Sequence, residues 1–196
     1  MNILIHGILT KSPEKSIGKF KRYIKDARLF SYGYIGVLGA LFKNKSIAKK
    51  LAKLINSVNE SGDKVTVYAH SNANAISVIA AKKYGAKIEN FICLGAALNR
   101  NITFPDSIKN ILVISTKKDK ATKAARFFDS MPVIGWMVPD IWGSMGTDNY
   151  TGNDKRVTKI FLDDIDDTLD DHGDYFSDED LPKINKLIIN WLLSLD

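Results

Sequence analysis

The chain alternates short apolar runs with longer amphipathic segments, and this alternation constrains its fold more than any other feature. Several short runs, such as ENFICLGAAL at 89–98 and KNILVIST at 109–116, are rich in branched residues and nearly continuous in hydrophobic character. Strands of this kind are typical of parallel sheets that are covered on both faces. In 45–62 and 181–195, by contrast, apolar residues recur every three to four positions, which predicts helices. We therefore expect an α/β protein with a doubly wound, mostly parallel sheet of about six strands and helices on both faces.

The predicted elements form a single domain over residues 1–196, because no linker or composition break divides them. Strands are expected at 2–7, 28–35, 64–70, 89–98, 109–116 and 157–165, and helices at 15–27, 45–62, 74–85 and 181–195. In sheets of this class the functional residues lie at the carboxyl ends of the strands. The residues that directly follow each predicted strand are therefore the first candidates for a site.

Charge and hydropathy exclude several classes of function. The net charge is +6, but residues 1–120 carry about +14 and residues 121–196 about −8. The lysines fall mostly on predicted helices, where a solvated face explains them, and no zinc-finger spacing or RNP-like motif is present, so no nucleic-acid partner is expected. The longest apolar stretch, YGYIGVLGALF at 32–42, is too short and too rich in glycine to span a membrane.

Cysteine usage and the first residues of the chain point to the cytoplasm. The single cysteine, Cys93, lies in an apolar run and is expected to be a small buried hydrophobe. It cannot form an internal disulfide, and MNILIHGIL lacks the basic n-region of a signal peptide. We expect a soluble cytoplasmic protein of unassigned oligomeric state.

Polar side chains with catalytic chemistry follow several of the predicted strands. His6 and Gly7 follow the first strand, Ser71 follows KVTVYAH, Asp119 follows KNILVIST, and His172 comes after VTKIFLDDI. Three of these positions supply a nucleophile, an acid and a base, in the chain order Ser, Asp, His. This set predicts nucleophilic catalysis by Ser71, with His172 as the base and Asp119 as the residue that orients it.

The stretch VYAHSNANAISV at 67–78 explains why a serine would stand between a strand and a helix. A nucleophile at such a tight corner needs small residues two positions before and after it, and these are Ala69 and Ala73. The backbone N–H groups of Asn72 and of Ile8, in the loop after the first strand, are the expected oxyanion donors. Taken alone, Ser71 could equally be a helix N-cap.

These motifs resemble the α/β-hydrolase superfamily, and within it the small lipase-like and esterase-like serine hydrolases. The resemblance runs over nearly the whole chain, from the His-Gly pair at 6–7 through the serine corner at 69–73 to Asp119 and His172, and WGSMG at 142–146 is similar to lipase-like sequences. The usual family pattern is G-x-S-x-G, whereas both glycines are alanines here. The first predicted strand begins at residue 2, so the resemblance implies a minimal version of the fold without the leading strands of larger members.

The acid and the base each have alternatives. His70 adjoins the serine but is expected to point into the sheet layer, and His6 fits the oxyanion loop, which leaves His172 as the base or as a surface histidine. Asp119 stands among lysines and could be a solvated carboxylate, in which case Asp140 or Asp148 would be the acid.

An acidic stretch around His172 raises the possibility of a calcium site. If Gly173 is taken as the loop glycine of an EF-hand, Thr168 occupies the first ligand position and His172 the fifth, so the pattern fails even though Glu179 fits the twelfth. We therefore expect an acidic solvated loop, with no metal and no cofactor.

Two apolar segments are expected to border the serine. The segment at 124–147 holds two of the three tryptophans and has no regular period, which suggests a lid or pocket excursion, although aromatic stretches are more often core. Together with the segment after the second strand it supplies the expected substrate-binding residues Tyr32, Tyr34, Trp136, Trp142 and Met145.

The resulting expectation is a serine hydrolase that cleaves carboxylic esters with an apolar acyl group. Esters are favoured over amides by analogy with the superfamily. Two alternatives stay open. One is an acyltransferase or thioesterase with the same triad, and the other is a non-catalytic binding protein, which the two alanines motivate.

Overall fold

The computed structural model describes residues 1–123, 142–165 and 172–195. Its centre is a sheet with the strand order β2-β1-β3-β4-β5-β6, in which every neighbouring pair is parallel. The six strands are β1 (Asn2–Ile5), β2 (Ala27–Phe30), β3 (Thr66–His70), β4 (Ile88–Leu94), β5 (Ile108–Ser115) and β6 (Val157–Phe161). The predicted doubly wound sheet is therefore confirmed, and in these residues it is wholly parallel.

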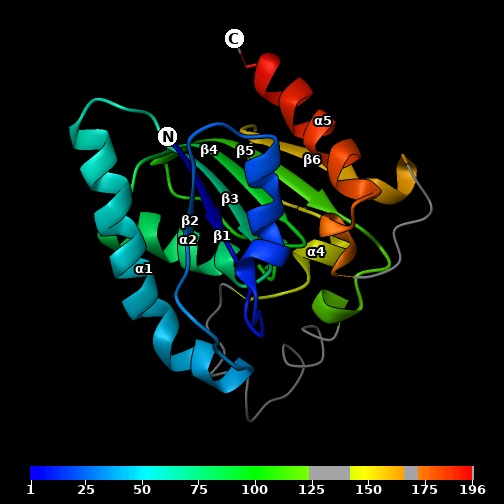
Figure 1. Ribbon diagram of the computed structural model, residues 1–196, viewed down its shortest axis with the longest axis horizontal. Coiled ribbons are helices and arrows are strands. Elements are labelled where there is room, and N and C mark those ends of the chain that lie inside the picture. Colours follow the sequence, from blue (N-terminus) through cyan, green and yellow to red (C-terminus); the bar gives the residue numbers. More distant parts are fainter. Residues whose placement is uncertain (124–141, 166–171, 196) are drawn as a thin grey trace.

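Helices cover both faces of this sheet (Figure 1). The α-helices are α1 (Val37–Glu60), α2 (Ala73–Tyr84), the short α4 (Met145–Asp148) and α5 (Asp180–Leu193), and the 3-10 helices are η1 (Pro13–Lys15), η2 (Ile17–Arg22), η3 (Leu162–Asp164) and η4 (Asp174–Phe176). Figure 1 places α1 and α5 on opposite sides of the sheet.

Alternate residues of each strand enter two separate apolar cores, because successive strand side chains point to opposite faces. One core packs strand residues such as Val67 and Cys93 against α1 and α2. The other packs strand residues such as Tyr68 and Ile92 against η2 and α5. Cys93 is fully buried, as expected, and burial raises the pKa of its thiol, which makes it unreactive.

Three predicted elements differ from the structure. The expected helix at 15–27 is a pair of 3-10 helices, and a Cβ at Gly18 would lie 2.9 Å from the Pro13 carbonyl oxygen, so the chain turns more tightly there than an α-helix. Strand β2 ends at Phe30, and helix α1 begins at Val37, eight residues before the predicted start.

All six parallel strands end at the same edge of the sheet, and this edge collects the loops that follow β1, β3, β4, β5 and β6. Within the described residues, no helix is long and apolar enough to cross a membrane. Most of the predicted excursion, residues 124–141 with Trp136 and Asp140, lies outside the described residues.

Candidate active site

Ser71 occupies a strained corner between β3 and α2. Its φ is 56°, in the left-handed region that costs a non-glycine residue roughly 1–2 kcal/mol. Four hydrogen bonds hold it there: its N–H donates to the Leu94 carbonyl at 3.0 Å, and its own carbonyl accepts from the N–H groups of Asn74 and Ala97 and from the side-chain amide of Asn74. A strained residue that its surroundings fix so firmly is typical of a functional site.

The two alanines that stand in place of the usual glycines are accommodated in the core of the protein. Ala69 and Ala73 are both fully buried and belong to the core that α1 and α2 cover. Their methyl groups therefore add to this apolar core, and the corner retains its left-handed serine.

Asp119 and His172 form a hydrogen-bonded pair. The carboxylate follows β5, is fully buried, and lies 2.6 Å from Nδ1 of His172 through its Oδ2 atom. Its other oxygen accepts a hydrogen bond from the Thr122 N–H, and the Thr147 hydroxyl donates to the Asp119 carbonyl, so the acid is fixed from two sides. An imidazole that donates from Nδ1 keeps the lone pair of Nε2 available as a base.

Gly95 connects this pair to the serine. It directly follows β4, where Leu94 is in register with His70 of β3, so Gly95 lies beside Ser71. A Cβ on Gly95 would lie 3.1 Å from Oδ2 of Asp119 and 3.2 Å from Cε1 of His172. The acid and the imidazole thus lie over the strand end next to the serine, and the structure brings the three predicted residues to one edge of the sheet.

The loop after β1 lies against the serine from the other side. A Cβ on Gly7 would come within 2.8 Å of Cβ of Ser71, so only glycine permits this approach. Within the described residues, neither the N–H of Ile8 nor the N–H of Asn72 has a hydrogen-bond partner. Both expected oxyanion donors therefore have an unpaired N–H group in the described part of the chain.

His6 and Tyr32 hold this loop. Their rings stack at 4.1 Å, and the Tyr32 hydroxyl donates to the His6 carbonyl at 2.6 Å. The Tyr32 N–H donates to Nε2 of His6 at 3.3 Å, so the imidazole carries its proton on Nδ1 and donates it to the Gly7 carbonyl at 2.8 Å. Burial lowers the pKa of His6, which favours this neutral form.

His70 packs against the imidazole of His172, a contact that the sequence did not suggest. Its ring packs against the ring of His172 with centroids 4.5 Å apart, and its Nε2 lies 3.2 Å from the His172 carbonyl oxygen. The ring of Phe176 also packs against His70 in a T-shaped arrangement, with centroids 4.8 Å apart. Burial and the neighbouring His172 lower the pKa of His70 well below its usual value, so it stays neutral.

Asn44 is another residue that sequence reasoning missed. Its side-chain amide exchanges two hydrogen bonds with that of Asn72, at 2.9 and 3.0 Å, and so anchors the residue that follows the serine. The signal was present in the sequence, because Asn44 lies on the same face of α1 as Ile47, Leu51 and Ile55. An asparagine in such an apolar stripe needs a buried partner.

The predicted substrate-binding residues have different environments. Tyr34 is 58% exposed, whereas Tyr32 and Trp142 are half-buried and pack against the core of α1 and α2. Met145 is fully buried in this core and offers no surface to a substrate in this structure. Helix α4, which contains Met145, instead supports the loop that carries Asp119, because the Gly146 carbonyl accepts a hydrogen bond from the Thr116 N–H. Substrate binding by these residues stays a prediction.

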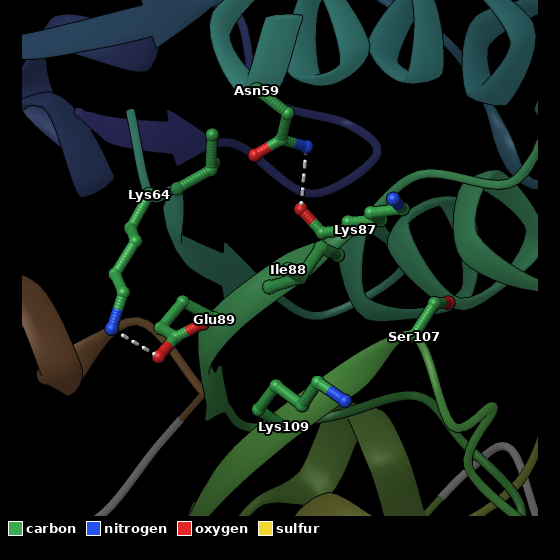
Figure 2. Close-up of a pocket in the computed structure, with 8 residues that line it drawn as sticks. Asn59, Lys64, Lys87, Ile88, Glu89, Ser107 and Lys109 are labelled. Carbon is green, nitrogen blue, oxygen red and sulfur yellow. Dashed lines mark hydrogen bonds and ion pairs between the residues drawn. The ribbon is translucent and has the colours of Figure 1, made fainter. Parts of the chain in front are cut away.

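A cavity of about 500 Å³ opens beside the imidazole of His172. It is lined by the following residues: Ile8, Thr10, Lys15, Ser16, His70, His172, Gly173, Asp174, Phe176 and Ser177. A second cavity of about 420 Å³ lies at the amino ends of β4 and β5 and is lined by Lys64, Lys87, Glu89 and Lys109, among others (Figure 2). Since all strands are parallel, this second cavity is at the edge of the sheet opposite to Ser71. In the described part of the chain, no cluster of side chains could hold a metal ion.

Solved structures with a similar fold are distant from this chain in sequence. The monoacylglycerol lipase of Paleococcus ferrophilus is 13% identical, with a TM-score of 0.57 over all of this chain and 94% of that one. XC6422 of Xanthomonas campestris, an α/β serine hydrolase without a lid, is 13% identical, with a TM-score of 0.55 over 94% of this chain and 78% of that one. Lipase B of Aspergillus fumigatus is 14% identical, with a TM-score of 0.55 over 84% of this chain, which spans 44% of the lipase.

These similarities identify the architecture. The protein has the α/β-hydrolase fold, and the residues that the structure describes include six parallel strands. No protein-family model and no curated protein matches the chain.

Proposed function

We propose that this protein is a serine hydrolase that cleaves carboxylic esters, with Ser71 as nucleophile, His172 as general base and Asp119 as the orienting acid. The observation that carries the proposal is the combination of a left-handed Ser71 with a buried Asp119 bonded to His172 over the adjacent strand end. The proposal is also supported by the structural neighbours, two of which are named as lipases and one as a serine hydrolase.

The reaction begins when Oγ of Ser71 attacks the ester carbonyl carbon and its proton passes to Nε2 of His172. The buried carboxylate of Asp119 holds the imidazole in the required tautomer and stabilises the imidazolium that forms. The negative charge on the carbonyl oxygen is then met by the N–H groups of Ile8 and Asn72, each of which contributes about 3 kcal/mol if it resembles other oxyanion donors. The imidazolium returns its proton to the leaving alcohol, and water releases the acyl group by the same steps.

An apolar acyl group is part of the proposal. The N–H of Leu9 donates to the Ile35 carbonyl at 2.9 Å, so the oxyanion loop borders the segment that precedes α1. Leu9 and Tyr34 expose apolar surface in this region, with 55% and 58% of their areas accessible. Exposed apolar side chains beside an oxyanion loop favour an acyl chain over a charged substituent.

The test is hydrolysis of p-nitrophenyl acetate, butyrate and octanoate by the wild type and by Ser71→Ala and His172→Ala. The proposal expects both variants to lose at least about a thousandfold in kcat, because neither nucleophile nor base can be replaced. Ser61→Ala, on an exposed turn after α1, is the matched control and should retain full activity.

A fluorophosphonate probe separates the alternatives. A thioesterase or acyltransferase would react with the probe at Ser71 but hydrolyse these esters poorly without its own thioester or acceptor. A non-catalytic binding protein would not react, and equal ester turnover by wild type and Ser71→Ala would refute the hydrolase.

A further inference from the structure

His70 is the last residue of β3 and directly precedes Ser71, and only 8% of its surface is exposed. Side chains alternate between the two faces of a strand. Tyr68, two residues earlier, belongs to the core that η2 and α5 cover, so His70 points to this same face. On this face the loop that carries His172 continues into η4, whose Phe176 ring packs against His70. The ring of His70 therefore has a fixed place between the end of β3 and η4.

His70 contacts both the ring and the backbone of His172. The two imidazole rings pack with centroids 4.5 Å apart and an interplanar angle of 34°, and Nε2 of His70 lies 3.2 Å from the His172 carbonyl oxygen. A carbonyl oxygen only accepts hydrogen bonds, so Nε2 carries the proton of His70 and donates it. Burial lowers the pKa of His70 well below its usual value, which keeps the ring in this neutral form.

These two contacts add to the restraint that Asp119 places on His172. The Asp119 carboxylate holds Nδ1 of His172 at 2.6 Å, but a hydrogen bond at one ring atom leaves the imidazole able to pivot about that atom. The packed ring of His70 opposes this rotation, and its hydrogen bond fixes the backbone from which the imidazole extends. Proton transfer requires Nε2 of His172 within hydrogen-bond reach of the serine hydroxyl, so the direction of the imidazole affects the rate.

Resting on the proposed ester hydrolysis, we infer that His70 is a positioning residue, which holds the imidazole of His172 in the direction of Ser71. It acts through His172 and exchanges no proton with the substrate. Because His70 and Ser71 are consecutive residues, one strand end fixes both the nucleophile and the direction of its base.

Three variants of His70 separate the two contacts. His70→Gln keeps a side-chain N–H donor without the ring, His70→Phe keeps a ring without the donor, and His70→Ala removes both. Each contact is expected to contribute roughly fivefold to kcat on p-nitrophenyl butyrate, so His70→Ala should lose about 25-fold and the other two variants about fivefold each. KM should stay within about twofold of the wild type, because the direction of the base matters in the transition state and not for substrate binding.

Trp191→Phe is the matched control for a loss of buried packing. Trp191 is buried in the same core as Tyr68 and Phe176, and its Nε1 donates to the Thr158 hydroxyl near the amino end of β6, away from Ser71. This variant should lower Tm, as the His70 variants do, but retain the kcat of the wild type.

Wild-type kcat in both His70→Gln and His70→Phe would overturn the inference, and these two variants keep the test decisive if His70→Ala does not fold. A loss of kcat in Trp191→Phe equal to that in the His70 variants would overturn it as well. Either result leaves the hydrolase proposal intact as long as Ser71→Ala is inactive, whereas turnover that is independent of Ser71 would overturn both.

Discussion

Gly95 gives the sharpest perturbation of the proposed site, because its missing side chain makes room for the acid and the base. In Gly95→Ala the new Cβ would meet Cε2 of Tyr175 at 3.0 Å, Oδ2 of Asp119 at 3.1 Å and Cε1 of His172 at 3.2 Å. Tyr175 and Asp119 are fully buried, whereas the His172 side chain is 17% exposed on a loop. We therefore expect His172 to move.

The expected effect has two parts. Alanine at a φ of +47° costs roughly 1–2 kcal/mol of stability, which lowers Tm by about 2–8 °C for a chain of this size. Displacement of the imidazole by several tenths of an ångström lowers kcat by about 10- to 100-fold, because general-base catalysis depends on this geometry.

The assay is kcat on p-nitrophenyl butyrate, with Tm measured by calorimetry on the same samples. Gly62→Ala is the control, since Gly62 has a φ of +89° and no atom within 4 Å of its built Cβ, so it adds backbone strain without touching the site. If Gly95→Ala and Gly62→Ala retain the same kcat, the placement of the acid and base over Gly95 is wrong.

Three further predictions test the neighbours of the serine. Asp119→Asn should lower kcat by about a thousandfold or more while the fold persists, because the amide holds the wrong tautomer of the base; a loss below tenfold would argue against the acid. Burial lowers the pKa values of His6 and His70 below the unfolded value of 6.5, so the unfolded chain binds more protons below that pH. The free energy of unfolding should then fall as the pH drops below about 6.5, by up to about 1.4 kcal/mol per pH unit for each histidine, and His70→Gln should reduce this slope in urea titrations. Asn44→Ala should lower the free energy of unfolding by about 1–3 kcal/mol, measured by urea denaturation, because it removes both hydrogen bonds between Asn44 and the buried amide of Asn72.

The strands and the position of the serine corner follow from local patterns. Near-continuous apolar runs predict buried parallel strands, and small residues around Ser71 predict a tight turn, because each pattern depends on its own few residues. Parallel pairing then forces the loops with Asp119 and His172 to the same edge. The placement of the three candidate residues at one edge of the sheet could therefore be predicted from the sequence, although the distances between them could not.

Helix boundaries near glycine were predicted less well. The predicted helix begins only at residue 45, whereas in the structure Gly36 is the N-cap of α1 and Gly39 lies inside it. A Cβ on Gly39 would come within 2.8 Å of the Ile35 side chain, so the glycine reflects close packing and not the end of the helix. This contact cannot be predicted from local sequence patterns.

The supporting contacts of the site are long-range, and this is why they were missed. Asn44 and Asn72 are 28 positions apart, and His70 and His172 are 102 positions apart. Nothing in the residues next to His70 indicates that its ring will pack against a histidine from another strand end. Only the assembled sheet brings these side chains together.

The central claim is that Ser71 is a nucleophile activated by His172. The most direct measurement is intact-mass and peptide mass spectrometry after brief treatment with a fluorophosphonate, on the wild type and on His172→Ala. The account predicts one adduct on the wild type, located on the peptide that contains Ser71, and little or none on the variant. An unlabelled wild type, or an adduct on another residue that persists in His172→Ala, would contradict it.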